Sequence, residues 1–324
     1  RLRCDWSSDV CSSDLMAREA GLTVDNAGFD TLMEQQRDRA RAAQKKEIIS
    51  VSSLSSGATT EFVGFERLSA TATVTEVVEE KKRTGIVLDR SPFYAEMGGQ
   101  VGDTGTLSIG GKTWAVTGTQ KAGDAFLHFI KGDGVPEVGG EAELAVDAAR
   151  RAAIQRHHTV THLFHWALHE VTSPDASQKG SYVGPEKLTF DFNSPALTPQ
   201  QLADIEQLVN ERIVDNAVVS WAEAPYSEVS GNDGILQFFG DKYGDTVRVV
   251  QIGGEANALN GYSMELCGGT HARPTGELGP FRISPESALA PGAPPAHAGA
   301  RLAPAPAAPP ARGAAAPPPA PPPP

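Results

Sequence analysis

Four histidines recur at helical spacing in the segment RRAAIQRHHTVTHLFHWALHEV, residues 150–171. At about 100° per residue, a helix places them all within about 40° of the first one. They are His158, His162, His165 and His169. The opposite side is apolar and carries Val160, Leu163, Phe164, Ala167 and Val171. The pattern predicts a helix that packs its apolar face against a core and presents imidazoles on the opposite face.

These imidazoles cannot all bind one metal ion, because a helix rises about 1.5 Å per residue. Only residues four positions apart can meet at a single ion, so either His158 pairs with His162 or His165 pairs with His169. An ordinary polar face with exposed histidines is the alternative interpretation. The helix alone does not decide between these possibilities.

The motif CGGTH at residues 267–271 supplies another pair of ligands at the same spacing. Cys267 offers a thiolate and His271 an imidazole, and zinc binds both groups well. Gly268 and Gly269 permit a tight backbone turn that directs both side chains toward one point. The alternative is that Cys267 is a small buried apolar residue, as a lone cysteine commonly is. Two compatible ligand pairs favour a zinc site, and a histidine-rich set is typical of catalytic zinc.

Residues 60–148 predict a small antiparallel β-barrel. Turn signals recur about every ten residues along this block, which is typical of short strands connected by hairpins. Gly110 and Gly111 separate two of the strands and indicate a tight hairpin. The most distinct strands are expected at 69–80, 85–94 and 112–119.

Residues 149–290 predict a mixed α/β domain after the barrel, so the fold class is α+β. Besides the histidine helix, a second helix is expected at 197–216, with Thr198 as its N-cap and Pro199 in its first turn. The expected strands are 218–224 and 245–253.

Both ends of the chain differ from its middle. Residues 1–15 have no helical or strand period and are interpreted as a non-native leader. Residues 16–59 predict a helical segment at 28–47 and a linker. Residues 291–324 consist almost only of Pro, Ala and Gly and predict a disordered low-complexity tail.

Charge and cysteine content limit the classes of partner. The formal net charge of −12 argues against a protein that holds nucleic acid by bulk charge, and we expect no DNA partner. The sequence lacks a continuous apolar run of about eighteen residues, so we expect no membrane partner. The 3 cysteines are too few for a disulfide framework, which indicates the reducing cytoplasm.

Four motifs are distinctive, namely HTVTH (158–162), QKGSYV (178–183), LTFDFN (188–193) and ELCGGTHARPTGELGPFRI (265–283). Together they closely resemble the editing domain of the alanyl-tRNA synthetase family. SPFYAEMGGQVGDTG (91–105) resembles the glycine-rich segment of the preceding barrel, and 28–47 resembles the end of the helical tRNA-recognition region. The resemblance spans about residues 20–290 and includes no aminoacylation motifs. It implies one Zn²⁺ per chain, bound by His158, His162, Cys267 and His271.

The resemblance also implies an activity, namely hydrolysis of the ester that joins serine or glycine to tRNA(Ala). Gln178 would then position a water molecule or the amino acid, although it could also be a surface glutamine. Thr161 could bond a substrate hydroxyl, or only its own helix backbone. Two other functions stay open, a free-standing trans-editing deacylase and a non-catalytic, zinc-stabilised tRNA-binding module.

Contacts with tRNA are the least defined expectation. Residues 150–290 carry ten Lys and Arg against seventeen Asp and Glu, so phosphates have few partners there. A local basic rim is expected from Arg150, Arg151, Arg156 and Lys179. The tripeptide Gly98–Gly99–Gln100 is expected to touch the tRNA end or to pack on the editing domain. A GGQ tripeptide also occurs in peptide release factors, where the glutamine places a water, and this is the weaker alternative.

Overall fold

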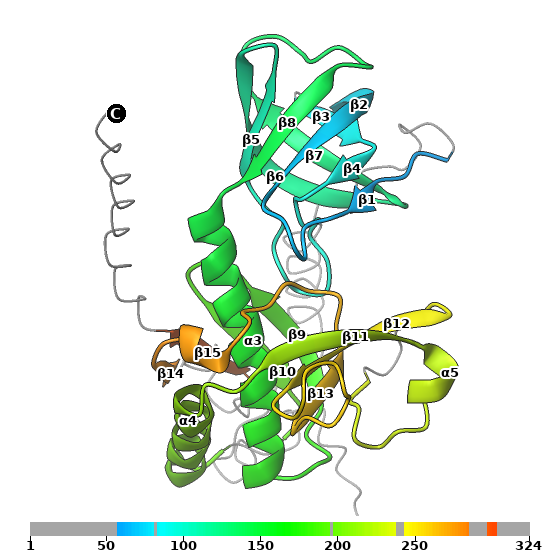
Figure 1. The fold of residues 1–324 in the computed structure, drawn as a ribbon. Coiled ribbons are helices and arrows are strands. Elements are labelled where there is room, and N and C mark those ends of the chain that lie inside the picture. Colours follow the sequence, from blue (N-terminus) through cyan, green and yellow to red (C-terminus); the bar gives the residue numbers. More distant parts are fainter. Residues whose placement is uncertain (1–56, 81–82, 195–196, 238–242, 285–296, 303–324) are drawn as a thin grey trace, which may run out of the picture. The chain divides into compact units, whose positions relative to one another are not determined.

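The computed structural model confirms the α+β class, with a β-barrel followed by a mixed α/β domain (Figure 1). All described residues belong to one compact unit. They are 57–80, 83–194, 197–237, 243–284 and 297–302. The predicted leader 1–15, the predicted helix 28–47 and most of the predicted tail lie outside the described residues.

Six antiparallel strands close the barrel. In their order around it they are β2 (Ser69–Glu80), β3 (Arg83–Leu88), β7 (Ala125–Lys131), β6 (Lys112–Ala122), β5 (Gly105–Ile109) and β8 (Glu141–Val146). Strand β8 illustrates the pattern, because Ala142, Leu144 and Val146 are buried while the residues between them are exposed. This period of two fills the barrel with apolar side chains.

Two local features decide where the barrel strands begin and end. Gly110 and Gly111 connect β5 to β6 with φ of 57° and 80°, a left-handed conformation that glycine adopts without strain. The predicted strand 85–94 is shorter than expected and divides into β3 and β4 (Arg90–Ser91). Asp89 interrupts it, because its carboxylate accepts hydrogen bonds from the N–H groups of Thr73 and Arg90. Strand β4 pairs in parallel with β1 (Glu61–Phe62) beside the barrel.

The two long helices begin at side-chain caps. Helix α3 (Ala148–Val171) carries the histidines, and the carboxylate of Asp147 accepts a hydrogen bond from the N–H of Arg150 at its first turn. Helix α4 (Pro199–Val214) begins at Thr198, which forms a capping box with Gln201, and Pro199 occupies the first turn as predicted. Each cap satisfies N–H groups that a helix start leaves without partners.

Two antiparallel sheets complete the α/β domain. The first has the order β14 (Phe281–Ser284), β15 (His297–Leu302), β10 (Leu188–Phe192) and β9 (Gln178–Val183). The second has the order β11 (Val219–Pro225), β12 (Thr246–Ile252) and β13 (Ser263–Leu266). The short helices are α5 (Tyr226–Val229) and η2 (Thr275–Glu277). The apolar sides of α3, α4 and both sheets share one core, which includes Phe164, Phe190, Val209, Val250 and Phe281.

Strand β15 lies inside the predicted tail. Its backbone pairs with β10 on one side and β14 on the other, so residues 297–302 continue the first sheet. Backbone pairing requires only free N–H and C=O groups, which every residue but proline has, so the composition of the tail did not reveal this strand. Among the described residues, no helix combines the length and the apolar character needed to span a membrane.

A buried arginine joins α3 to the barrel. Arg151 is 1% exposed, and its guanidinium pairs with the carboxylate of Asp103, which is itself fully buried. It also donates to the carbonyl oxygens of Gly64 at 2.8 Å and Pro92 at 2.9 Å. A buried charge is tolerated only with such a complete set of partners. The start of the histidine helix is therefore fixed against the barrel.

Candidate metal centre

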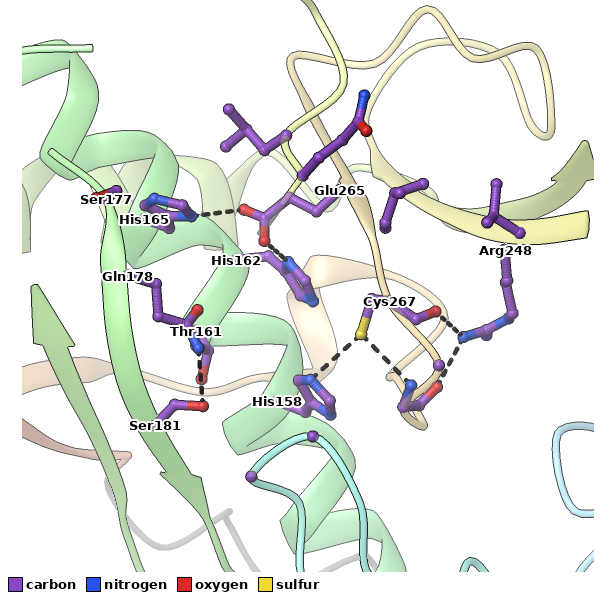
Figure 2. A pocket seen from close by; sticks show the side chains of 18 of the residues that line it. His158, Thr161, His162, His165, Ser177, Gln178, Ser181, Arg248, Glu265 and Cys267 are labelled. Carbon is purple, nitrogen blue, oxygen red and sulfur yellow. Dashed lines mark hydrogen bonds and ion pairs between the residues drawn. The ribbon is translucent and has the colours of Figure 1, made fainter. Parts of the chain in front are cut away.

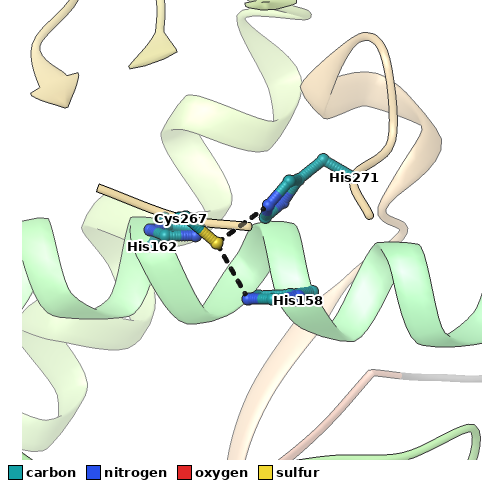
Figure 3. Close-up of side chains that lie close together, drawn as sticks. All are labelled: His158, His162, Cys267 and His271. Carbon is teal, nitrogen blue, oxygen red and sulfur yellow. Dashed lines mark hydrogen bonds between the residues drawn. The ribbon is translucent and has the colours of Figure 1, made fainter. Parts of the chain in front are cut away.

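Helix α3 places the first two histidines one turn apart on the same side. The rings of His158 and His162 are stacked, with centroids 5.4 Å apart and an interplanar angle of 9°. Both side chains are buried, at 7% and 5% exposure. Figure 3 shows them extending side by side from α3 toward the CGGTH segment.

The CGGTH segment returns its two ligands to the same point. Strand β13 ends immediately before Cys267, whose Sγ lies 3.4 Å from Nε2 of His158 and 3.4 Å from Nε2 of His271. One donor atom each from His158, His162, Cys267 and His271 lies within 4.8 Å of all the others. The structure thus brings together the four residues that the resemblance implied.

Gly269 is required by the close approach of this segment to α3. A Cβ atom at position 269 would lie 2.0 Å from Cε1 of His158 and 2.9 Å from Oε1 of Gln100. At the neighbouring Gly268 the nearest atom would be a methyl group of Met97 at 3.5 Å, an ordinary contact. Only the second glycine of the motif is therefore required by space.

Two imidazoles of the cluster contact an oxygen atom through Nδ1. Nδ1 of His158 lies 2.7 Å from Oε1 of Gln100, and Nδ1 of His162 forms an ion pair with a carboxylate oxygen of Glu265 at 2.8 Å. Because an amide oxygen can only accept, Nδ1 of His158 carries the proton and its Nε2 is left for a metal. The amide of Gln100 is oriented by Thr270, whose N–H donates to Oε1 and whose Oγ1 accepts from Nε2, both at 2.9 Å.

The electrostatics favour the metal-binding forms of Cys267 and His271. Burial raises the pKa of the Cys267 thiol, but His158 and His271 outweigh this effect and hold the pKa well below its usual range. Burial lowers the pKa of His162, but the neighbouring Glu265 outweighs it and raises the pKa to about 10, so a metal that binds here must displace a proton from this imidazole. Burial also lowers the pKa of His271 to about 3, so this imidazole is neutral. A thiolate and a neutral imidazole are the ligand forms that a metal requires.

The donor set fits a metal ion. Nε2 of His162 is buried and has no hydrogen-bond partner among the described residues. Leaving a buried polar atom unpaired is unfavourable, and a metal ion at the cluster would satisfy it. Three imidazoles and one thiolate form a nitrogen and sulfur set that suits a tetrahedral ion.

The second histidine pair on α3 has other partners. Nδ1 of His165 lies 3.0 Å from Glu265, and Nε2 of His169 donates to the carbonyl oxygen of Ala176 at 2.6 Å. This resolves the choice between the two pairs, because the metal-capable group among the described residues contains neither residue. The interpretation as an exposed polar face is wrong, since His165 is only 3% exposed. Glu265 was not identified from the sequence, although its place two residues before Cys267 on a strand directs both side chains to the same face.

A cavity of ≈ 890 Å³ lies beside the cluster and is lined by His158, His162 and Cys267. Thr161 and Gln178 line it as well, and Figure 2 shows them next to each other together with Ser181. Oγ1 of Thr161 donates to the carbonyl oxygen of His157 at 2.8 Å, which is the helix-backbone bond considered as the alternative. Nε2 of Gln178 donates to Oγ of Ser181 at 3.1 Å. Both side chains keep an acceptor oxygen beside the cavity.

The sequence is similar to those of aminoacyl-tRNA synthetases. A model of the class II (A) tRNA synthetases matches residues 10–150, and a model of the second additional domain of threonyl and alanyl tRNA synthetases matches residues 247–293. The alanine–tRNA ligase of Akkermansia muciniphila is 49% identical over 280 residues, which are 86% of this chain and 30% of that protein. The alanine–tRNA ligase of Methylacidiphilum infernorum is 44% identical over 86% of this chain and 29% of that protein. That of Opitutus terrae is 42% identical over 90% of this chain and 32% of that protein.

The chain belongs to the alanyl-tRNA synthetase family. It spans about 30% of the length of these relatives. Cys267 and His271 lie within the second matched segment, whereas His158 and His162 lie between the two matched segments. The first match begins at residue 10, inside the predicted leader.

The four basic residues predicted to contact tRNA differ in their exposure and in their partners. Lys179 is exposed at the cavity, and Arg156 is half-buried on α3. The guanidinium of Arg150 donates to the carbonyl oxygen of Gly102 at 2.9 Å and is partly buried. The expectation for Arg151 is wrong, because its buried guanidinium is bound by Asp103 and by carbonyl oxygens and cannot reach a phosphate.

The glycine-rich loop packs on the α/β domain, which was one of its two expected roles. Gly98 and Gly99 line the cavity with φ of 59° and 84°, and the carbonyl oxygen of Gly99 accepts from the N–H of Val183 on β9 at 2.9 Å. Gln100 is 0% exposed, so the predicted contact of its side chain with tRNA is wrong. The same burial excludes the release-factor interpretation, which requires an accessible glutamine.

Arg248 is a further residue of the site that the sequence did not reveal. Its Nη1 donates to the carbonyl oxygens of Cys267 at 2.9 Å and Gly269 at 2.8 Å, which fixes the backbone of the ligand loop (Figure 2). Its guanidinium lies against the rings of both Phe65 and Trp221, 4.1 and 4.3 Å from their centroids. Burial lowers the pKa of Arg248 to about 10, so it remains charged at neutral pH.

Proposed function

We propose that this chain hydrolyses the ester between serine or glycine and tRNA(Ala), as the editing part of an alanyl-tRNA synthetase in the cytoplasm. The observation that carries the proposal is the cavity of ≈ 890 Å³, which combines the metal-capable cluster with Thr161 and Gln178. Its volume suits a small ligand such as an aminoacylated nucleoside. Family membership supports the choice of tRNA as the substrate.

We propose zinc as the ion, with one ion per chain. The ligands would be His158, His162, Cys267 and His271. Bound zinc would supply polarisation of the ester carbonyl or a lower pKa for a bound water. The chain contributes the orientation of the ligands, since Gln100 holds His158 and Glu265 holds His162.

The two polar side chains would select and orient the amino acid. Oγ1 of Thr161 already gives its proton to the carbonyl oxygen of His157, so it can accept a hydrogen bond from the hydroxyl of serine. Oε1 of Gln178 can accept from the amino group of the substrate or from a water. Alanine lacks the hydroxyl and would leave the acceptor of Thr161 without a partner, which favours serine over alanine. Glycine lacks the hydroxyl too, so this contact selects serine only.

Affinity for tRNA from this chain alone would be low. The segment 150–290 is acidic, and among the predicted cations Lys179 lines the cavity while Arg150 and Arg156 on α3 do not. We therefore expect a high KM and a steep loss of activity with added salt. The class II synthetase match over residues 10–150, which includes the predicted helix 28–47, supports a synthetase part over a free-standing deacylase.

The test compares release of serine and of alanine from the same tRNA, with and without a zinc chelator. Serine should be released faster, and removal of zinc should abolish that release. Equal rates for both amino acids, or serine release that persists after zinc is demonstrably gone, would contradict the proposal. The chain must first be shown to be folded by circular dichroism.

Zinc content provides an independent measurement. The double variant Cys267→Ala, His271→Ala should contain no stoichiometric zinc by elemental analysis. Cys11→Ala is the matched cysteine control and should retain about one zinc ion per chain. Full zinc content in the double variant would show that the ligands are assigned incorrectly.

A further inference from the structure

A second cavity shares a wall with the first. Its volume is ≈ 430 Å³, and both cavities are lined by Tyr94, Met97, Arg248 and Gly268. Gly268 belongs to the ligand loop, so the second cavity lies directly beside the metal-capable cluster. Nothing in the proposed hydrolysis uses it.

Aromatic side chains line the part of the second cavity that is not shared with the first. They are Phe62, Phe65 and Phe126, all partly exposed. The ring centroid of Phe62 lies 4.8 Å from that of Phe65 and 5.8 Å from that of Phe126. A half-exposed cluster of rings at the edge of a cavity offers flat apolar faces to a ligand.

Arg248 adds a cation to these rings. Its guanidinium stacks on Phe65, with 4.1 Å to the ring centroid, and its Nε and Nη2 are buried without a hydrogen-bond partner among the described residues. Lys121 is an exposed cation of the same wall, and Glu223 is its acidic member. Aromatic rings combined with a guanidinium plane are the groups on which single-stranded nucleotides stack.

We propose that the second cavity binds the base next to the terminal nucleotide of the tRNA 3′ end, stacked on Phe65 and its neighbours. The inference rests on the proposed function, because the terminal nucleotide would carry the amino acid into the first cavity. The shared wall places adjacent nucleotides in adjacent cavities. Arg248 would connect the two events, since the guanidinium beside the base also holds the carbonyl oxygens of Cys267 and Gly269.

The experiment measures stacking without hydrolysis. The probe is an uncharged RNA hairpin with a single-stranded 3′ end that carries 2-aminopurine at the position before the last. Binding to the full chain should quench its fluorescence. Phe65→Leu keeps an apolar side chain but removes the ring, and should abolish the quenching and weaken binding about tenfold. Phe65→Tyr keeps the ring and should preserve both signals.

Trp166→Leu is the matched control, because Trp166 also stacks with an arginine, Arg212 at 5.1 Å, but lines neither cavity. It should behave like the unmodified chain. A second measurement uses the unmodified chain, so it does not depend on whether Phe65→Leu folds. A hairpin with an abasic site at the probed position should bind the unmodified chain about tenfold more weakly than the intact hairpin. Because the base is already missing, removing the neighbouring ring with Phe126→Leu should weaken binding of the abasic hairpin little further.

Failure of this inference can be separated from failure of the proposed function. Hydrolysis of the serine ester without quenching, or full affinity for the abasic hairpin, would overturn the base site alone. Quenching that Phe65→Leu leaves unchanged would also overturn it. Quenching that disappears in Phe65→Leu, in a chain that hydrolyses no ester, would support the base site and refute the editing activity.

Discussion

Substituting Gly269 by alanine should remove His158 from the metal centre. The added Cβ would lie 2.0 Å from Cε1 of His158, and ordinary contact begins at 3.4 Å, so the ring must retreat by about 1.4 Å (3.4 − 2.0). Ligand distances in metal sites tolerate only about 0.2 Å. One of the four donors would therefore be lost.

The expected effect can be stated for metal affinity and for stability. Changes to groups that merely orient a ligand weaken metal binding about 10- to 100-fold, and displacement of a ligand should reach at least the upper end of that range. In the metal-free protein, overpacking at this buried position should destabilise the fold by about 1–3 kcal/mol. Equilibrium dialysis against zinc measures the first effect, and urea unfolding with and without zinc measures the second.

Gly268→Ala is the control for this experiment. Its Cβ would meet only a methyl group of Met97 at 3.5 Å, so zinc affinity and stability should stay close to those of the unmodified chain. If Gly269→Ala bound zinc with unchanged affinity, or if Gly268→Ala lost as much as Gly269→Ala, the steric argument for the second glycine would be refuted.

Three further predictions follow from buried groups. Glu265→Gln should weaken zinc binding about 10- to 100-fold in the same dialysis, because the carboxylate that holds His162 is lost, whereas His165→Ala should retain one zinc ion. Burial lowers the pKa of His128 to about 4 from an unfolded value of 6.5, so stability should be full above pH 6.5 and fall by about 2 kcal/mol at pH 5. Urea unfolding at both pH values should show this loss, and His128→Asn should reduce it. Asp103→Asn should destabilise the protein by about 3–5 kcal/mol in urea, because it leaves the guanidinium of Arg151 buried without its anion; a loss below 1 kcal/mol would contradict this.

The metal donors could be predicted because their spacing is a local property. His158 and His162 are four residues apart on a helix, and Cys267 and His271 are four apart around two glycines, so each pair converges without knowledge of the rest of the fold. The resemblance then selected the helical pair that lies beside Cys267 and His271 in the structure. A sequence pattern does not reveal what covers a helix face, and for this reason an exposed polar face stayed open as the alternative interpretation.

The groups that hold the donors could not be predicted, because they come from distant parts of the chain. Gln100 is 58 residues before His158 and 170 residues before Thr270, yet it contacts both. Arg151 is 48 residues after Asp103, and its neighbours in sequence made it look like part of a phosphate-binding rim. Arg248 has no motif around it, and only the return of β12 beside the ligand loop gives it a role.

The contact of Gln100 with His158 and Thr270 has a consequence for how this chain can be divided. The sequence pattern places a boundary between the barrel and the α/β domain near residue 148, but a chain cut there would lose the group that fixes one imidazole and the anion that neutralises Arg151. Its metal site would be left with a freely turning ligand. The barrel and the α/β domain are therefore expected to be inherited, expressed and engineered together as a single module.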